Sequence, residues 1–302
     1  MDNHKTGFVA ILGLPNAGKS TLLNSLLGQK LSIITSKPQT TRRRILGILS
    51  EENFQVIFLD TPGIISPSYL LQEKMMDDIK TSIDDADVVI FIVDVKDDST
   101  AEKLLEQEFV KKVVSDSKKS KLLILNKIDS ITQEEIKGLI LNFEDKKVFD
   151  EVIPVSAKLS FNTERVIEDL LKYIPEGPKL YPGDQLTDAN ERFFVSEIIR
   201  EKILEFYRDE VPYSCEVKIA EFKERDKRKD FINAEIVVEK DSQKAIIIGE
   251  SGISIKKLGQ AARKSIEEFL QREVFIELRV KVRKKWRSDE NLLKSFGYIK
   301  KE

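Results

Sequence analysis

The sequence has little of what extracellular or membrane proteins use. It contains one cysteine, Cys215, which excludes an internal disulfide and suits a reducing compartment. Its single histidine, His4, lies in what we expect to be a frayed N-terminus, so Cys215 has no histidine partner and is expected to be a core residue rather than a nucleophile. No apolar run approaches the ~18 residues of a membrane span, and no signal-peptide hydrophobic segment is present. We therefore expect a soluble, cytoplasmic protein.

An excess of charge of one sign is also missing. The 302 residues include 50 Lys and Arg and 52 Asp and Glu, so the net charge predicts no polyanionic partner for the chain as a whole. There is no internal repeat and no low-complexity segment. The length allows two domains, each with its own core.

What is present is a phosphate-binding pattern. Residues 13–20 read Gly-Leu-Pro-Asn-Ala-Gly-Lys-Ser, between an apolar run at 8–12 and an amphipathic one at 21–27. This is the G-x-x-x-x-G-K-[ST] spelling of a P-loop, in which a strand turns sharply into a helix and backbone N–H groups converge on a polyphosphate. We expect Lys19 to reach the β- and γ-phosphates and the Ser20 hydroxyl to bind Mg²⁺. A chance glycine-rich turn is less favoured because the strand and helix context is present.

A second polar turn, Asp-Thr-Pro-Gly at 60–63, ends the predicted strand 56–59. Asp60 is expected to face the same crevice and hold Mg²⁺ through water, and the Gly63 N–H to meet the γ-phosphate. On its own, an Asp before Pro-Gly is more often a turn former. After a P-loop it is the expected acid on the metal side.

A third turn, Asn-Lys-Ile-Asp at 126–129, follows the predicted strand 122–125. The Asp129 carboxylate can accept hydrogen bonds from guanine N1–H and its exocyclic amine, whereas adenine offers no matching pair of donors. The alternative is an ordinary turn with Lys127 in solvent. Residues 156–158, Ser-Ala-Lys, fit a loop that completes the base pocket, and this is the weakest signal of the set.

Residues 39–43, Gln-Thr-Thr-Arg-Arg, lie between the P-loop helix and the next strand. A threonine here can close over Mg²⁺ when the γ-phosphate is present; Thr40 and Thr41 both qualify, and we favour Thr41. With residues 63–72, this segment is expected to be the mobile part that hydrolysis releases.

Short apolar runs alternate with helical stretches over residues 1–174. Strands are expected at 8–12, 44–49, 56–59, 88–93, 122–125 and 152–155, with helices after Thr21 and at 71–83, 101–115, 133–143 and 163–174. Several of these strands are continuously apolar, as in sheets covered on both faces. The pattern predicts a doubly wound α/β domain with its ligand at the carboxyl ends of the strands.

Pro and Gly residues punctuate positions 175–187, which we interpret as a linker. Residues 188–302 are expected to form a small α+β domain. Its elements are a helix at 188–207, strands at 215–222 and 231–239, an apolar strand at 245–248, a helix at 254–270, a strand at 274–282 and a last helix at 289–295.

The second domain contains Gly-Glu-Ser-Gly at 249–252, after the apolar run and before a helix. Such a loop lets a nucleic-acid backbone come close, and it resembles that of K-homology (KH) domains. The strand 279–287 contains no acid; Val280 and Val282 alternate with basic residues, which predicts one core face and one basic face. Trp286 could stack on a base. The alternative is that the charges are a solvated face and Trp286 is core.

These patterns, in this order, resemble translation-factor-like GTPases. The spelling Gly-x-Pro-Asn-x-Gly-Lys-Ser and the paired threonines at 40 and 41 are similar to the Era branch, over nearly the whole chain. The resemblance implies a P-loop GTPase domain and a type II KH domain, with GTP or GDP and Mg²⁺ as cofactors. It also implies binding near the 3′ end of small-subunit (16S) ribosomal RNA, a role in small-subunit assembly, and peripheral association with the cell membrane; we take the protein to be a monomer.

The site residues that follow form four groups. Catalytic roles are expected for Lys19, Thr41 and Gly63. Nucleotide contacts are expected from Gly13, Leu14, Pro15, Asn16, Ala17, Gly18, Lys19, Ser20, Thr21, Asp60, Thr61, Pro62, Gly63, Ile64, Asn126, Lys127, Asp129, Ser156, Ala157 and Lys158. Metal contacts are expected from Ser20, Thr41, Asp60 and Asn16. RNA contacts are expected from Gly249, Gly252, Lys256, Lys257, Arg263, Arg279, Lys281, Arg283, Lys284, Lys285 and Trp286.

Three positions depart from the patterns of related proteins. Ile64 stands where many small GTPases have a water-orienting glutamine, so intrinsic hydrolysis is expected to be slow unless another group or an ion places the water. Asn16 matches a P-loop asparagine that helps hold K⁺ in related GTPases; the alternative is that it only shapes the loop. Glu250 is unfavourable near a phosphate, so the loop is expected to approach RNA less closely or Glu250 to point away.

Two other functions fit part of the pattern. The chain could bind GTP without turnover and use its second domain for a protein partner. It could also be a GTPase of another RNA process, such as tRNA modification, although relatives of that kind usually carry a C-terminal reactive cysteine, which this chain lacks.

Overall fold

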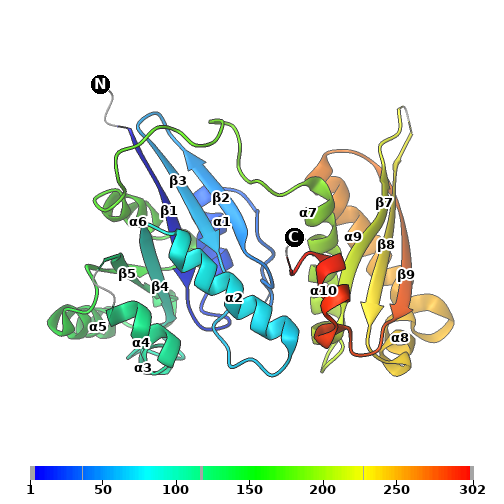
Figure 1. Ribbon diagram of the computed structural model, residues 1–302, viewed down its shortest axis with the longest axis horizontal. Coiled ribbons are helices and arrows are strands. Elements are labelled where there is room, and N and C mark those ends of the chain that lie inside the picture. The colour runs from blue at the N-terminus through cyan, green and yellow to red at the C-terminus, as the bar shows by residue number, and fades with distance from the viewer. Residues whose placement is uncertain (1–3, 36, 116–117, 227, 300–302) are drawn as a thin grey trace. The chain divides into compact units, whose positions relative to one another are not determined.

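The computed structural model describes residues 4–35, 37–115, 118–226 and 228–299. The chain forms two compact units (Figure 1). The first contains Met1–Ser66 and Met75–Asp188, and the second contains Pro67–Lys74 and Ala189–Glu302.

The first unit is built on a six-stranded sheet of order β2-β3-β1-β4-β5-β6. Its strands are β1 (Lys5–Leu12), β2 (Ile45–Ser50), β3 (Phe54–Asp60), β4 (Val88–Asp94), β5 (Ser120–Asn126) and β6 (Glu151–Val155). The edge strand β2 is antiparallel to β3, and the other pairs are parallel. The helices are α1 (Lys19–Leu27), α2 (Leu70–Asp85, of which the residues from Met75 on belong to this unit), α3 (Glu102–Leu105), α4 (Glu108–Ser115), α5 (Gln133–Lys146) and α6 (Thr163–Leu170).

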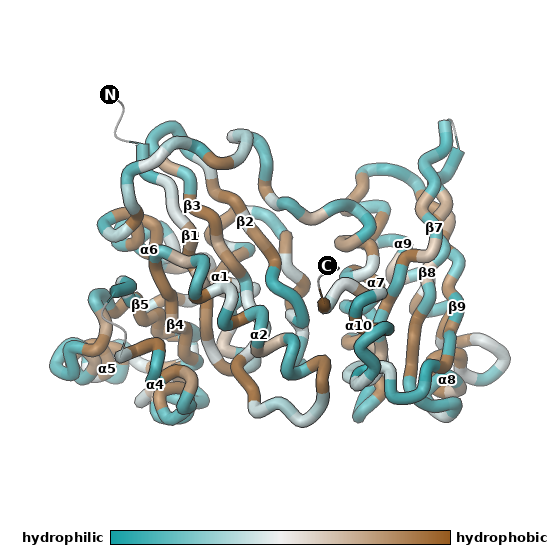
Figure 2. The backbone as a smooth tube through the Cα atoms, in the orientation of Figure 1, coloured by the Kyte–Doolittle hydropathy of each residue, from teal (hydrophilic) through white to brown (hydrophobic). Residues whose placement is uncertain are grey.

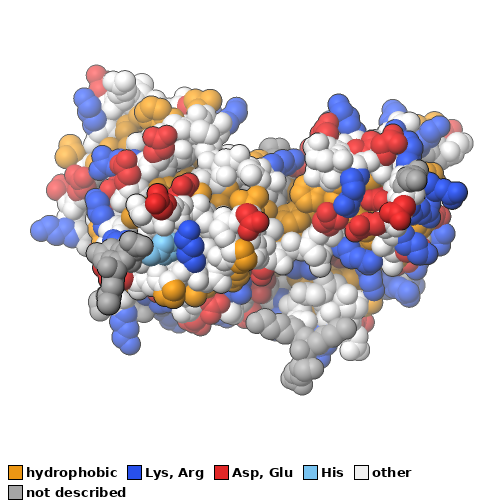
Figure 3. Space-filling view, turned by 90° about the horizontal axis from the view of Figure 1, so that it is seen from above, with side chains coloured by type: hydrophobic (Ala, Val, Ile, Leu, Met, Phe, Trp, Pro, Cys, Tyr) orange, Lys and Arg blue, Asp and Glu red, His pale blue; other side chains and the backbone are white. Residues whose placement is uncertain are grey.

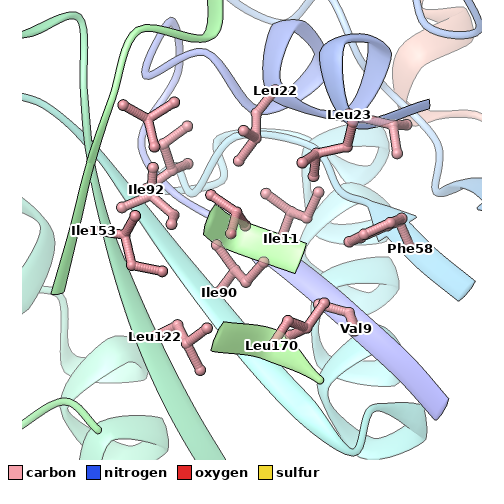
Figure 4. Close-up of a cluster of buried hydrophobic side chains, with 14 of the residues drawn as sticks. Val9, Ile11, Leu22, Leu23, Phe58, Ile90, Ile92, Leu122, Ile153 and Leu170 are labelled. Carbon is pink, nitrogen blue, oxygen red and sulfur yellow. The ribbon is translucent and has the colours of Figure 1, made fainter. Parts of the chain in front are cut away.

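Successive residues of the central strands pack into two different cores. Val9 and Ile11 belong to one buried cluster that includes the α1 residues Leu22 and Leu23 (Figure 4). Ala10, the residue between them, belongs to the opposite cluster with residues of α2 and α5. Because both faces are covered, the inner parts of the central strands, such as residues 88–93 of β4, are apolar at successive positions and form hydrophobic stretches (Figure 2). The predicted doubly wound α/β class is confirmed.

The helix expected over 101–115 is instead two short helices, α3 and α4. The Asp98 carboxylate accepts the backbone N–H groups of Lys103 and Leu104, at 3.1 and 3.0 Å, and so fixes a separate first turn. The helix expected to reach residue 174 ends at Leu170.

Two terminal stretches of the first unit are held by hydrogen bonds. His4, expected in a frayed terminus, exchanges contacts with Gly177: the Gly177 N–H donates to the His4 carbonyl at 2.9 Å, and His4 Nδ1 lies 3.0 Å from the Gly177 carbonyl. In the predicted linker, the N–H groups of Leu180 and Tyr181 donate to Gln55 Oε1. The segment therefore lies along this unit.

The second unit has a three-stranded sheet of order β7-β8-β9, with β7 antiparallel and β9 parallel to β8. Its elements are α7 (Glu191–Phe206), β7 (Glu216–Lys223), β8 (Asp230–Val238), α8 (Asp241–Ile248), α9 (Ile253–Leu270), β9 (Val274–Val282) and α10 (Glu290–Phe296). Apolar side chains of α7 and α9 form one core with the sheet. Cys215 is fully buried in it, as expected.

The apolar strand expected at 245–248 is wrong, because these residues end helix α8. Gln243 Oε1 accepts the N–H groups of Glu239 and Lys240, which starts the helix, and Gly249 ends it with a φ of 72°. Ile246 is exposed and Ile247 is buried, the pattern of one helical face rather than of a buried strand.

Candidate functional site

A cleft of about 840 Å³ opens at the carboxyl ends of β1, β4 and β5. Of the residues expected to contact a nucleotide, those that line it are Leu14, Pro15, Asn16, Ala17, Gly18, Lys19, Ser20, Thr21, Gly63, Asn126, Lys127, Asp129 and Lys158. Thr41 also lines it, together with Ile33, Ile34, Asp94 and Asp97, which sequence reasoning missed. Three turns far apart in sequence therefore meet around one cavity.

The P-loop turn is fixed by the packing of Gly18. Its φ is 102°, and a Cβ at this position would lie 2.2 Å from Asn126 Nδ2, so a side chain cannot be accommodated. Asn126 Nδ2 donates to the Ala17 carbonyl at 2.8 Å, which ties the third turn to the first.

Lys19 is buried at the start of α1. Its Nζ donates to the carbonyls of Gly13 and Leu14, at 3.1 and 3.0 Å. Burial lowers the pKa of Lys19 to about 8, and the charge of Asp60 opposes this shift. A polyphosphate would supply the missing negative charge and hold the lysine protonated.

Hydroxyl groups surround the Asp60 carboxylate. Its Oδ2 accepts from Ser20 at 2.8 Å and from Ser32 at 2.9 Å, while Thr41 Oγ1 lies 3.4 Å away. Burial raises the pKa of Asp60, and the three hydroxyls oppose the shift. Among the described residues, Asp60 Oδ1 is buried without a hydrogen-bond partner.

This donor set fits Mg²⁺, which takes oxygen ligands and is usually bound by one or two carboxylates with water and substrate phosphates. Ser20 and Thr41 would supply hydroxyl oxygens, and the unused oxygen of Asp60 would accept from a metal-bound water. The described residues contain no cluster of three or more His, Cys, Asp or Glu side chains that could hold a metal without such help.

The structure separates the two candidate threonines. Thr41 is buried, and its Oγ1 lies 2.8 Å from Ser20 Oγ. Thr40 instead donates to the Lys37 carbonyl at 2.7 Å and contacts Thr35. Thr41, and not Thr40, thus lies beside Ser20 and Asp60, the residues that we expect to hold Mg²⁺.

Hydrogen bonds fix the turn at residues 126–129 beside the cleft. Ser156 Oγ donates to Asp129 Oδ1 at 2.6 Å, and Lys127 Nζ donates to the Asn16 carbonyl at 2.9 Å. Lys127 also forms an ion pair with Asp94. Asp129 itself is exposed in the same cavity as Lys19, so its carboxylate is available to a base.

Several residues that we expected to contact the nucleotide lie behind the residues that line the cleft. The Thr61 hydroxyl donates to the Ile11 carbonyl at 2.6 Å. Ile64 is 3% exposed and packs in the core with residues of α2, and its N–H donates to the Gly13 carbonyl. Ile64 therefore does not line the cavity, and its expected nucleotide contact stays a prediction. Gly13, Asp60, Pro62, Ser156 and Ala157 likewise do not line the cavity.

Sequence reasoning missed Asn24 and Ser32. Asn24, on α1, accepts the N–H groups of Leu31 and Ser32 and donates to the Ser32 carbonyl, at 2.7 to 2.8 Å. This clamp places the Ser32 hydroxyl on Asp60. The only signal in the sequence was a pair of polar residues near the P-loop helix.

In the second unit, the Gly249–Gly252 loop joins α8 to α9. A Cβ on Gly249 would lie 2.2 Å from Ser254 Oγ, and its φ is positive, so glycine is required. Glu250 is exposed in the loop, and Lys256 and Lys257 are exposed in the first turns of α9. Basic and acidic side chains thus share this loop.

Two predictions for the RNA face are wrong. Trp286 is fully buried; its Nε1 donates to the Ser214 carbonyl at 2.8 Å and its ring meets Phe296, so it is a core residue. Arg279 is paired with Glu277 and Lys281 with Glu235, so this face is mixed in charge rather than basic. Glu235 comes from the neighbouring strand β8 and Glu277 from earlier in β9, so both acids lie outside the acid-free residues 279–287.

Comparison with known proteins identifies the family of this chain. A family model of 50S ribosome-binding GTPases matches residues 8–127, and a KH-domain model matches residues 210–287. GTPase Era of Clostridium botulinum (strain Eklund 17B / Type B) is 43% identical over 98% of this chain and 99% of its own length. The chain belongs to the Era GTPase family. A chloroplastic GTPase ERA1 of Zea mays is 47% identical over 98% of this chain and 71% of its own length.

Solved Era structures agree over both units. A point variant of Aquifex aeolicus Era bound to GDP·AlF₄⁻ has a TM-score of 0.91 and 40% identity, covering 97% of this chain and 99% of its own. Era in complex with MgGDPNP and nucleotides 1506–1542 of 16S ribosomal RNA has the same TM-score and identity, covering 98% and 99%. As an Era family member, this protein is a GTPase that uses GTP, GDP and Mg²⁺.

Among the described helices, none has both the length and the apolar character needed to cross a bilayer.

Proposed function

We propose that this Era family GTPase binds the 3′ end region of 16S ribosomal RNA and acts as a switch in assembly of the small ribosomal subunit. The observation that supports this most strongly is the match, over nearly the whole chain, to an Era structure that holds both MgGDPNP and that RNA. The cleft of the first unit supplies the nucleotide site, and the Gly249–Gly252 loop supplies the nucleic-acid side.

The residues of the cleft have separable roles in hydrolysis. Lys19 neutralises charge on the β- and γ-phosphates, and the Gly63 N–H meets the γ-phosphate. Ser20 and Thr41 hold Mg²⁺, which neutralises the phosphate oxygens when it is bound, and Asp60 orients these hydroxyls. Asp129 selects guanine.

No side chain at position 64 reaches the attacking water, because Ile64 is in the core. We propose that K⁺ near Asn16, whose side chain is exposed in the cleft, supplies charge there. Hydrolysis by the wild-type protein should be faster in K⁺ than in Na⁺ buffer, and Asn16→Ala should remove the difference. Equal rates in the two salts would contradict this role.

The nucleotide is expected to control RNA binding through residues 39–43 and 63–72, which the γ-phosphate orders. RNA affinity measured with a GTP analogue and with GDP should differ several-fold. Identical affinities would exclude this coupling. We further propose a cytoplasmic location with a membrane-peripheral fraction, which cell fractionation in buffers of low and high salt would test.

The function itself is tested by crosslinking the purified protein to total cellular RNA, with and without a GTP analogue, and sequencing the attached RNA. Enrichment of the 3′ end of 16S RNA is expected. Enrichment of tRNA, or no enriched RNA, would overturn the proposal.

A further inference from the structure

One face of the sheet in the second unit is not covered by the helices α7 and α9. Ile232, Ala234 and Ile236 of β8 point into the core beneath these helices. The residues between them point the other way, and Phe231 and Asn233 are partly exposed. Figure 1 shows α7 and α9 on one side of β7, β8 and β9. We call the other side the open face.

Two aromatic rings lie at one end of the open face. Phe231 and Phe275 are register partners on β8 and β9, and their rings stack with centroids 6.1 Å apart and planes 14° from parallel. The Arg225 guanidinium lies 5.0 Å from the centroid of the Phe231 ring. Phe275 is 56% exposed, and β9 is an edge strand of the described sheet, so the outer face of its ring meets no further strand.

The hairpin that joins β7 to β8 brings positive charge to the same end. Its described residues 223–226, 228 and 229 include four basic and two acidic side chains. Arg225, Arg228 and Lys229 are exposed. Lys229 and Glu273 form an ion pair at 3.3 Å in which both side chains are exposed. Exposed ion pairs contribute little to stability, so an RNA phosphate can replace Glu273 as the partner of Lys229. In Figure 3, basic and acidic side chains are interspersed over the second unit.

We propose that this end of the open face is a second contact for single-stranded RNA, in which a base stacks on Phe275 and neighbouring phosphates approach Arg225, Arg228 and Lys229. The inference rests on the proposed RNA-binding function and extends it. A stacked ring backed by a guanidinium and flanked by exposed cations matches the chemistry of bases and phosphates together. An apolar protein partner would instead favour aliphatic neighbours, and the next partners along the strands are Asn233 and Glu277.

The new contact lies far from the glycine loop. Phe231 is at the start of β8, whereas α8 and the Gly249–Gly252 loop follow its end. The nine residues of β8 span roughly 27 Å at about 3.3 Å per residue. A short RNA can therefore occupy only one of the two contacts, and a longer one can occupy both.

The test compares two RNA probes on the full chain: nucleotides 1506–1542 of 16S RNA and a four-nucleotide fragment of it. Phe275→Ala should weaken binding of the long probe about fivefold or more, because the stacking of a base on an aromatic side chain is removed. Phe275→Leu should weaken it similarly, and Phe275→Tyr should restore it. Phe206→Ala, which removes an exposed ring at the end of α7, should leave both affinities unchanged.

A neutral hairpin variant, with Arg225→Gln, Arg228→Gln and Lys229→Gln, should flatten the salt dependence for the long probe. The log–log slope should fall by about 0.7 for each phosphate that the hairpin no longer neutralises. A thermal unfolding transition unchanged from wild type will show that each variant is folded.

The outcomes separate this inference from the function on which it rests. If wild type binds neither probe, the proposed RNA-binding function fails. If wild type binds and Gly252→Asp weakens binding, but Phe275→Ala does not, only the second contact is overturned. It is also overturned if Phe275→Leu binds as wild type does, or if Phe275→Ala weakens binding to a ribosomal protein and not to RNA.

Discussion

The nucleotide cleft and the open face of the KH unit arrange charge in opposite ways. At the cleft, Lys19 in the lining and Asp60 behind it are buried, and each is held by specific hydrogen bonds. On the open face, Arg279 and Lys281 are partly or fully exposed and paired with acids. Buried charges have a defined geometry and large energetic consequences, whereas exposed ones are screened by solvent and exchange partners readily. The predictions below test this difference, from the largest effect to the smallest.

The largest effect is expected at the base site. Asp129→Asn replaces two charge-assisted acceptor interactions with guanine, so GDP affinity should fall about 100-fold or more, since each such bond contributes about 1.5–3 kcal/mol. Affinity for xanthosine diphosphate should rise. Asp97→Asn is the matched control, because Asp97 also lines the cleft and is exposed, but its carboxylate pairs with Lys103. Retention of GDP affinity in Asp129→Asn would show that the carboxylate does not read the base.

The second-largest effect is expected from a substitution in the core of the second unit. Trp286→Ala removes a fully buried ring and leaves the Ser214 carbonyl unpaired, which should lower the free energy of unfolding of this unit by about 3–5 kcal/mol. Trp286→Phe should cost less. Chemical denaturation followed by circular dichroism measures the change, and GDP affinity serves as the control that should not move. A Trp286→Ala variant as stable as wild type would contradict a core role for this ring.

The Ser32 clamp should have an intermediate effect. Ser32→Ala removes one hydroxyl from the buried Asp60 carboxylate, which should cost about 1–3 kcal/mol at this site and raise the Mg²⁺ concentration needed for half-maximal hydrolysis about tenfold. Ser25→Ala removes a partly exposed hydroxyl of the nearby helix α1, which contacts Ser160 and not Asp60, and should change nothing. Unchanged Mg²⁺ dependence in Ser32→Ala would mean that Asp60 is positioned without it.

The lowered pKa of Lys19 makes nucleotide binding pH-dependent. The unfolded chain binds more protons than the folded one between the folded pKa of about 8 and the usual 10.5, so the nucleotide-free unit gains stability as pH rises through this window. Binding GDP requires the charged lysine, so affinity should fall about threefold between about pH 7.5 and about pH 8.5. Calorimetry in buffers of different ionisation enthalpy should detect proton uptake, and a buffer-independent enthalpy would contradict it.

The smallest effect is expected on the open face. Glu277→Gln releases Arg279 from an exposed pair, so RNA affinity should rise only about twofold. Glu108→Gln, which breaks an exposed pair in the first unit, is the control. A rise of more than about tenfold would mean that the open face is not screened as described.

The cleft could be predicted well because its functional residues lie in short contiguous motifs, each directly after a predicted strand. Glycine spacing, strand ends and single polar residues place Lys19, Ser20 and Asp129 around one cavity with no further information, and the structure brings them together. The structure also separates Thr41 from Thr40, because burial against Ser20 depends on how the loop folds back. Ser32 could not be identified for the same reason.

The RNA face was predicted less well. The alternation within one strand predicts a basic face at Arg279 and Lys281, but strand pairing brings Glu235 of β8 beside them. Trp286 was expected to be exposed because a local pattern does not show which residues α10 will cover. The stacked pair of Phe231 and Phe275 was missed because the register between β8 and β9 is not visible in the chain.

Competition binding of guanine and adenine diphosphates to the purified protein, with Mg²⁺ present, tests the central claim most directly. If the three turns form one guanine nucleotide site, GDP should displace a fluorescent GDP derivative at concentrations about 100-fold or more below ADP, since only guanine pairs with Asp129. Equal displacement by the two nucleotides, or a preference for ADP, would contradict the account.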